Sequence, residues 1–239
     1  MQIKWHYIKM ILLLGLVVFL FAFASGKNAK RNIPKPKINF LGEDNLFITS
    51  DNVSKLLIQN YGALKNVTKE TLDLNVLENA LKSNAMIKNA EVYLSVDGTL
   101  NAEVEQKTPI ARVSTKVSYY IDTDGEYMPL SSNFSARVPL ITGYVEKNNL
   151  KNLYEVAQKV TNDNFLKTHV YEIHQDKNEK LYLKLRQCNF MVKLGDVEFI
   201  DKKVNNLKAF YKKTSKEKTL NNYSVVNLQF ENQVICTKI

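Results

Sequence analysis

The side chains of this chain that could perform acid–base or metal chemistry are few and lie far apart. The three histidines are His6, His169 and His174, and the last two have no cysteine or third ligand nearby at the spacing of a metal site. Asp122 and Asp124 flank a turn, where aspartate is favoured because its side chain hydrogen-bonds the backbone. We therefore expect ordinary surface or half-buried histidines and turn aspartates, with no metal site and no catalytic site.

The sequence also lacks the short motifs that place a nucleophile, a metal-ligand pair or a phosphate-binding loop. It contains no GxSxG, GxGxxG, GxxxxGK(S/T) or HExxH pattern. We therefore predict a protein that is not an enzyme and that has no cofactor and no small-molecule substrate. A secreted hydrolase whose catalytic residues come together only in the fold is an alternative.

The two cysteines, Cys188 and Cys236, form no CxxC pair, so a zinc site or a redox motif has no support. Both lie in strand-like runs, which favours two buried thiols. A disulfide between them is the alternative if this part of the chain lies outside the cytosol.

The net charge of +9 comes from lysines spread along the chain, with one denser run at 202–218. We interpret this excess as solvation of the surface, and we predict no nucleic-acid partner. Hydrophobic residues make up 45% of the 239, which is enough to form the core of one large domain or two small ones.

Residues 10–24, MILLLGLVVFLFAFA, form an uncharged apolar segment between flanking lysines. With Tyr7 included and Lys9 extended toward the membrane surface, it reaches the lower limit of about 17 residues for a membrane span. Three interpretations follow: a retained span, a signal peptide cleaved at an A-x-A-like site at 22–24, or a span of reversed orientation. The reversed orientation is considered because more basic residues follow the segment than precede it.

The next segment predicts a strand, two helices and a hairpin. A strand at 37–48 precedes a helix that Ser50 or Asp51 can cap and Gly62 can end, and Asp73 can cap a second helix. Apolar and polar residues then alternate on both sides of Asp97-Gly98, a dipeptide typical of a tight β-turn.

The remainder of the chain predicts a β-rich domain interrupted by two amphipathic helices, at 150–160 and 200–211. Five stretches, taken in their order and spacing, resemble the FtsQ/DivIB family of bacterial cell-division proteins: NAMIKNAEV (84–92), EQKTPIA (105–111), YYIDTDG (119–125), VPLITG (138–143) and VKLG (192–195).

The resemblance implies an α+β fold: a single N-terminal transmembrane helix, then a small POTRA-like β-α-α-β-β module packed against a larger, mostly antiparallel β-domain with two helices. The expected divisions are a short cytoplasmic tail at 1–8, a transmembrane helix at 9–26, a linker at 27–36, the POTRA-like domain at 37–107, and a β-domain with C-terminal partner-binding strands at 108–239.

The resemblance also implies a function. It indicates a bitopic inner-membrane scaffold with a cytoplasmic N-terminus, enriched at the division septum. Such a scaffold recruits division proteins of the FtsB and FtsL type and so regulates septal peptidoglycan synthesis. With this family in view, a retained span with its N-terminus inside is favoured. The alternative function is an exported POTRA-containing component of protein transport or outer-membrane assembly, although the chain has room for one module and no barrel.

We place partner binding on the last strand-like segment, residues 223–230, because an exposed edge strand can be extended by a strand of another protein. Val226, Leu228 and Phe230 are expected to face the core, so the interaction would use the backbone edge. The predicted partner-binding residues are Tyr223, Val225, Asn227, Gln229, Phe230 and Glu231.

Overall fold

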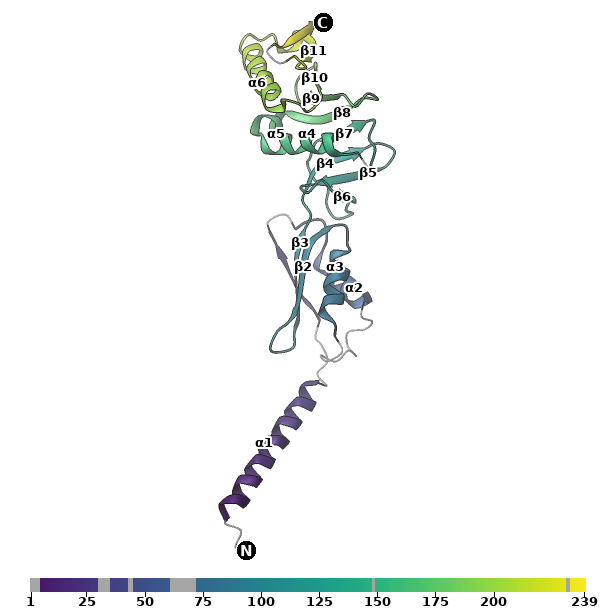
Figure 1. The fold of residues 1–239 in the computed structure, drawn as a ribbon. Helices are drawn as coiled ribbons and strands as arrows, with labels where there is room; N and C mark the ends of the chain where they lie inside the picture. The colour runs from purple at the N-terminus through teal and green to yellow at the C-terminus, as the bar shows by residue number, and fades with distance from the viewer. Residues whose placement is uncertain (1–4, 30–34, 43–44, 61–71, 148, 231–232) are drawn as a thin grey trace. The chain divides into compact units, whose positions relative to one another are not determined.

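The computed structural model describes residues 5–29, 35–42, 45–60, 72–147, 149–230 and 233–239 (Figure 1). The chain is an α+β protein, as predicted, and it divides into two compact units, residues 1–106 and 107–239. The first unit includes the N-terminal helix and the small module, and the second unit is the larger β-domain.

Helix α1, Trp5–Ala29, contains the apolar segment seen in the sequence. Its stretch Ile8–Gly26 is long and apolar enough to cross a membrane, judged by length and composition, and none of that stretch is buried by the described chain. An apolar helix that the described protein leaves uncovered is suited to a lipid environment. A signal sequence would have the same composition.

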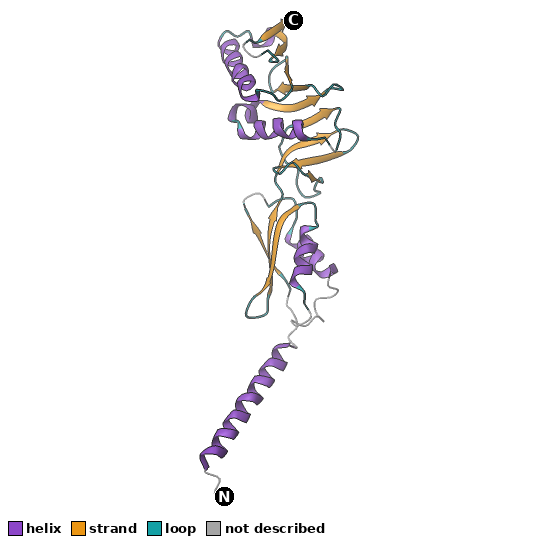
Figure 2. Cartoon of the chain, in the orientation of Figure 1, coloured by secondary structure: helices purple, strands orange, loops and turns teal. Residues whose placement is uncertain are grey.

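The small module has the predicted order of strand, helix, helix, strand and strand. Its sheet has the order β1-β3-β2, with β1 parallel and β2 antiparallel to the central strand β3. Helices α2 and α3 lie beside one face of this sheet (Figure 2). The elements are β1 Lys37–Leu41, α2 Ser50–Asn60, α3 Leu74–Lys82, β2 Ile87–Leu94 and β3 Leu100–Gln106.

The two helices of the module begin at different kinds of cap. Asp73 caps α3 as predicted, because its carboxylate accepts hydrogen bonds from the N–H groups of Asn75 and Val76. The cap predicted for α2 at Ser50 or Asp51 is wrong. Ser50 is already helical, and the Thr49 hydroxyl oxygen accepts the N–H of Asn52 at 3.2 Å. The predicted stop at Gly62 lies outside the described residues.

The Asp97-Gly98 hairpin is confirmed. Gly98 has a φ of +90°, which glycine adopts without a Cβ clash, and its N–H donates to the Ser95 carbonyl oxygen at 2.8 Å. The Asp97 carboxylate accepts the N–H of Thr99 at 3.0 Å. Local chemistry alone therefore accounts for this turn.

The β-domain is built on one nine-stranded sheet of order β12-β11-β10-β9-β8-β7-β4-β5-β6. Most neighbouring strands are antiparallel; the parallel pairs are β10 with β11, β7 with β8 and β4 with β7. The strands are β4 Pro109–Ser114, β5 Ser118–Asp122, β6 Tyr127–Met128, β7 Leu140–Gly143, β8 Val170–Gln175, β9 Leu181–Leu185, β10 Met191–Gly195, β11 Tyr223–Asn227 and β12 Ile235–Lys238.

The helices of this domain are α4 Lys151–Asn162, α5 Asn164–His169 and α6 Ile200–Lys216. Buried apolar side chains of α4 and α6 join those of the strands in a single core. The sequence predicted α4 and α6 but missed α5. A helix of six residues is too short to show an apolar period, and it directly follows α4 (Figure 1).

Candidate partner-binding site

The strand predicted to offer an open edge is not at the edge of the sheet. β11 lies between two strands: Val226 is opposite Val192 of β10 in a parallel pair and opposite Cys236 of β12 in an antiparallel pair. The prediction of an open backbone edge along 223–230 is therefore wrong for β11. The physical reason is that the chain returns after β11, and residues 235–238 take the position where a partner strand was expected.

The side chains of this segment follow the predicted alternation as far as Leu228, one residue beyond the end of β11. Val226 and Leu228 are fully buried, as expected of core residues. Phe230 was expected in the core but is 45% exposed, because β11 ends at Asn227 and the chain then turns. The turn is stabilised by the Asn227 side chain, whose oxygen accepts the N–H of Gln229 at 3.0 Å.

The other predicted partner-binding residues have varied positions. Tyr223, Val225 and Asn227 are half-buried on β11. Gln229 packs over the turn after β10, where a Cβ added to Gly195 would lie 2.6 Å from the Gln229 amide nitrogen. Glu231 lies outside the described residues.

The edge strand next to β11 is β12, the last of the described strands, and the two-residue strand β6 forms the opposite edge of the sheet. Among the strands that the structure describes, none pairs with the outer side of β12. Ile235, Thr237 and Lys238 are exposed, whereas Cys236 is half-buried against the core. The sequence carried a weaker signal: Val234 and Cys236 share one face of an extended segment just after Glu231-Asn232, which indicates a further strand but does not say which strand it pairs with.

Asp122 is a structural residue, in agreement with the turn prediction. Its side chain is fully buried, and its Oδ1 accepts the N–H groups of Asp124 at 3.0 Å and Glu126 at 2.8 Å. The Lys107 ammonium lies 2.8 Å from its Oδ2 and 2.6 Å from a Glu126 oxygen. Burial acts to lower the pKa of Lys107, but bonding to Asp122 and Glu126 outweighs burial and raises it.

The histidines and cysteines form no reactive cluster in the described parts of the chain. His174 Nδ1 lies 2.9 Å from the Thr142 hydroxyl, and His169 Nδ1 lies 2.8 Å from the Phe165 carbonyl oxygen. No group of three or more His, Cys, Asp or Glu residues in the described chain could hold a metal ion.

Both thiols are free and half-buried, and burial raises the pKa of each, so both thiols are poorly reactive. Cys188 lies in the connection between β9 and β10, so the expectation of a strand at this position is wrong; Cys236 lies in β12 as expected.

Asp163 links α5 to α6 through hydrogen bonds and an ion pair. Its Oδ1 accepts the N–H groups of Phe165 and Leu166, and its Oδ2 accepts from Lys208 at 2.5 Å. Burial acts to raise the pKa of Asp163, but the bonds from Lys208 and the helix N–H groups hold it below its ordinary value of 3.8. Because the folded-state pKa is the lower one, the stabilisation is complete above about pH 5 and is lost as the pH falls through 3.8 and then through the lowered folded-state value.

We expect Asp163→Asn to flatten the fall in unfolding free energy between about pH 5 and pH 2.5, because the variant has no carboxylate to protonate there. Urea unfolding at each pH measures this slope. Asp201→Asn is the control for the loss of one negative charge, because the Asp201 side chain is 78% exposed and its ion pair with Lys159 is open to solvent. Asp163→Asn should flatten the slope more than this control does. Equal slopes for Asp163→Asn and the wild type would show that Asp163 does not contribute.

The combination of an apolar N-terminal helix, a β-α-α-β-β module and a β-domain with an open terminal strand defines a POTRA-bearing protein with one potential membrane span. A POTRA-like domain matches residues 41–105, and the family model described as "FtsQ/DivIB, C-terminal related" matches residues 108–237, more than half of the chain. The chain belongs to the FtsQ/DivIB family, as its sequence motifs indicated.

The chain is also similar to the cell division protein FtsQ of Geotalea daltonii (strain DSM 22248 / JCM 15807 / FRC-32). The two are 25% identical over 180 residues, which cover 70% of this chain and 64% of that protein. The match therefore spans less than two thirds of the relative. The family relation and the apolar helix α1, the one candidate span among the described residues, fit a single-pass protein of the inner membrane.

Proposed function

We propose that this protein is a membrane-tethered, non-enzymatic scaffold of the bacterial cell-division machinery. The N-terminus would be cytoplasmic, α1 would be retained in the inner membrane, and both folded units would lie outside the cytoplasm and gather at the division septum. Membership of the FtsQ/DivIB family, the name of the Geotalea relative and the apolar stretch Ile8–Gly26 support this proposal. A fluorescent fusion spread evenly around the envelope would contradict the septal placement.

The scaffold would recruit division proteins of the FtsB and FtsL type and so regulate septal peptidoglycan synthesis. The observation that carries this step is the position of β12 at the end of the nine-stranded sheet, with its outer side unpaired among the described strands. The N–H and C=O groups on that side can bond to a partner strand. Ile235 and Thr237 are exposed beside those groups and could contribute to specificity.

Proline substitutions in β12 test this proposal, because proline removes a backbone N–H. The N–H groups of Cys236 and Thr237 point to opposite sides of the strand, one toward β11 and one outward. The substitution that removes the outward N–H should preserve the β11–β12 pair and weaken partner binding about 10- to 100-fold, the equivalent of about 1–3 kcal/mol.

The measurement is the affinity of full-length protein in lipid nanodiscs for an FtsB–FtsL complex. Hydrogen exchange of β11 identifies which of Cys236→Pro and Thr237→Pro retains the native pairing. Thr237→Ala retains its N–H and should bind within about twofold of the wild type. Unchanged affinity in both proline variants would exclude β12 as the binding edge.

A further inference from the structure

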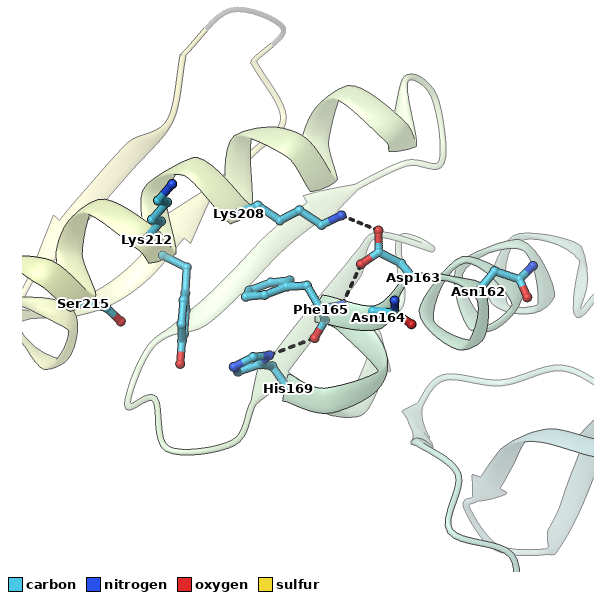
Figure 3. Close-up of a pocket in the computed structure, with 9 residues that line it drawn as sticks. Asn162, Asp163, Asn164, Phe165, His169, Lys208, Lys212 and Ser215 are labelled. Carbon is cyan, nitrogen blue, oxygen red and sulfur yellow. Dashed lines mark hydrogen bonds and ion pairs between the residues drawn. The ribbon is translucent and has the colours of Figure 1, made fainter.

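A second surface of the β-domain has the features of a binding pocket and lies on different elements from β12. It is an open depression of about 780 Å³ between α5 and α6 (Figure 3). Lys208, Tyr211 and Lys212 form the α6 wall, because residues at i, i+3 and i+4 share one face of a helix. Phe165 and His169, one turn apart on α5, line the opposite side.

Three aromatic rings form a contiguous surface in this pocket. The Phe165 and His169 rings are stacked with centroids 4.4 Å apart, and the Tyr211 ring meets them edge-on at 5.1 Å and 4.8 Å. The contact between His169 Nδ1 and the Phe165 carbonyl oxygen holds the imidazole in place. All three side chains are only half-buried. Such a surface can bind an apolar group with little loss of side-chain entropy, because its rings are already packed.

The charge of the pocket is positive. Asp163 and Lys208 neutralise one another across it, as the dashed contact in Figure 3 shows. Lys212 is exposed and forms no ion pair with the described residues. Helix α6 as a whole carries six lysines and one aspartate. The field at the pocket therefore favours a ligand with negative charge.

We propose that this pocket binds an acidic peptide segment of a partner protein. An aromatic or aliphatic side chain of the peptide would lie on the three rings, and a neighbouring carboxylate would pair with Lys212. The exposed side-chain amides of Asn162 and Asn164 at the rim supply donors and acceptors suited to a peptide backbone. Among the described lining residues there is no arginine, the side chain whose fork geometry suits phosphate groups.

Selection of a random dodecapeptide phage library on the full-length protein in zwitterionic nanodiscs tests the proposal. The enriched sequences should place Asp or Glu next to Phe, Tyr, Trp or Leu. A synthetic copy of an enriched peptide should lose about 10-fold in affinity for Lys212→Glu, because repulsion replaces attraction. Tyr211→Leu, which retains apolar bulk but removes the ring, should also bind more weakly.

Lys213→Glu is the matched control. Lys213 is the next residue on the same helix, is exposed and does not line the pocket, so this substitution should change affinity less than twofold. Whichever of Cys236→Pro and Thr237→Pro retains the native β11–β12 pairing should leave peptide binding unchanged, which separates this site from the β12 edge.

Four results would overturn the proposal: no enrichment of acidic sequences, equal losses for Lys212→Glu and Lys213→Glu, loss of the peptide with the proline variant that retains the native β11–β12 pairing, or Lys212-dependent binding of anionic lipid vesicles or peptidoglycan fragments without peptide binding.

Discussion

Gly143→Ala should lower the unfolding free energy of the β-domain by roughly 3–5 kcal/mol, which corresponds to a fall of about 10–20 °C in its melting temperature. Gly143 has a φ of +90°, and a Cβ built on it would lie 2.1 Å from the backbone oxygen of Gln175 and 2.8 Å from the His174 ring. The positive φ alone costs about 1–2 kcal/mol for alanine. The remainder arises because the contacting oxygen belongs to the backbone and cannot rotate away.

The loss of stability in Gly143→Ala should begin at the pair of strands β7 and β8. Gly143 is paired with Gln175 where the parallel strands β7 and β8 end, and the Gln175 oxygen also accepts the N–H of Tyr144 at 2.9 Å. Relief of the clash therefore requires the two strands to separate. Hydrogen exchange should show loss of protection in β7 and β8 before other strands, while urea unfolding reports the total change.

Gly195→Ala is the matched control for this effect. Gly195 lies in the same domain with a φ of +80°, but the atoms that crowd its Cβ position belong to the flexible Gln229 side chain. The Gln229 side chain can move, so we expect Gly195→Ala to lower the unfolding free energy by only about 1–2 kcal/mol. Equal losses at the two glycines would show that the backbone contact at Gly143 does not matter.

Asp122→Ala should lower the unfolding free energy of the β-domain by about 3 kcal/mol. This is the second of the two largest effects that we expect. Among the described residues, the substitution leaves the Lys107 ammonium, whose side chain is 11% exposed, with the exposed Glu126 as its one counter-ion. It also removes the acceptor for the N–H groups of Asp124 and Glu126, which shape the turn between β5 and β6. Asp122→Asn retains an acceptor oxygen, so its unfolding free energy should fall by about half as much as that of Asp122→Ala.

A double-mutant cycle separates the two contributions. Lys107→Met removes the buried cation while retaining an apolar chain of similar length, so Asp122→Ala should cost less in this background than in the wild type. Urea unfolding of the four proteins supplies the coupling free energy. Strict additivity would mean that the loss comes from the turn and not from the ion pair.

Local features of the fold were predictable from the residues themselves. Asp97-Gly98 specifies a tight turn because only glycine adopts the required φ cheaply, and Asp73 caps a helix by bonding to N–H groups two and three residues ahead. Asp122 organises its turn in the same way. The apolar stretch of α1 is readable from composition alone. Each of these features depends on groups within a few residues of one another.

The sheet edge and the pocket depend on contacts between residues far apart in the chain. The sequence predicted that β11 lies at the edge of the sheet. In the structure β11 pairs with β10 in parallel and with β12 in antiparallel orientation. The sequence could not show this, because the alternation of side chains within a strand does not specify which strands pair with it. The pocket likewise brings α5 against α6, with Asp163 bonded to Lys208.

The sequence by itself determined the family, the order of elements in the small module and the Asp97-Gly98 turn, because these follow from local patterns of side chains. The tertiary structure alone decided that β12, rather than β11, forms the open edge and that Phe165, His169 and Tyr211 form one aromatic surface. Both outcomes depend on how the whole chain buries its apolar faces, which no short segment specifies.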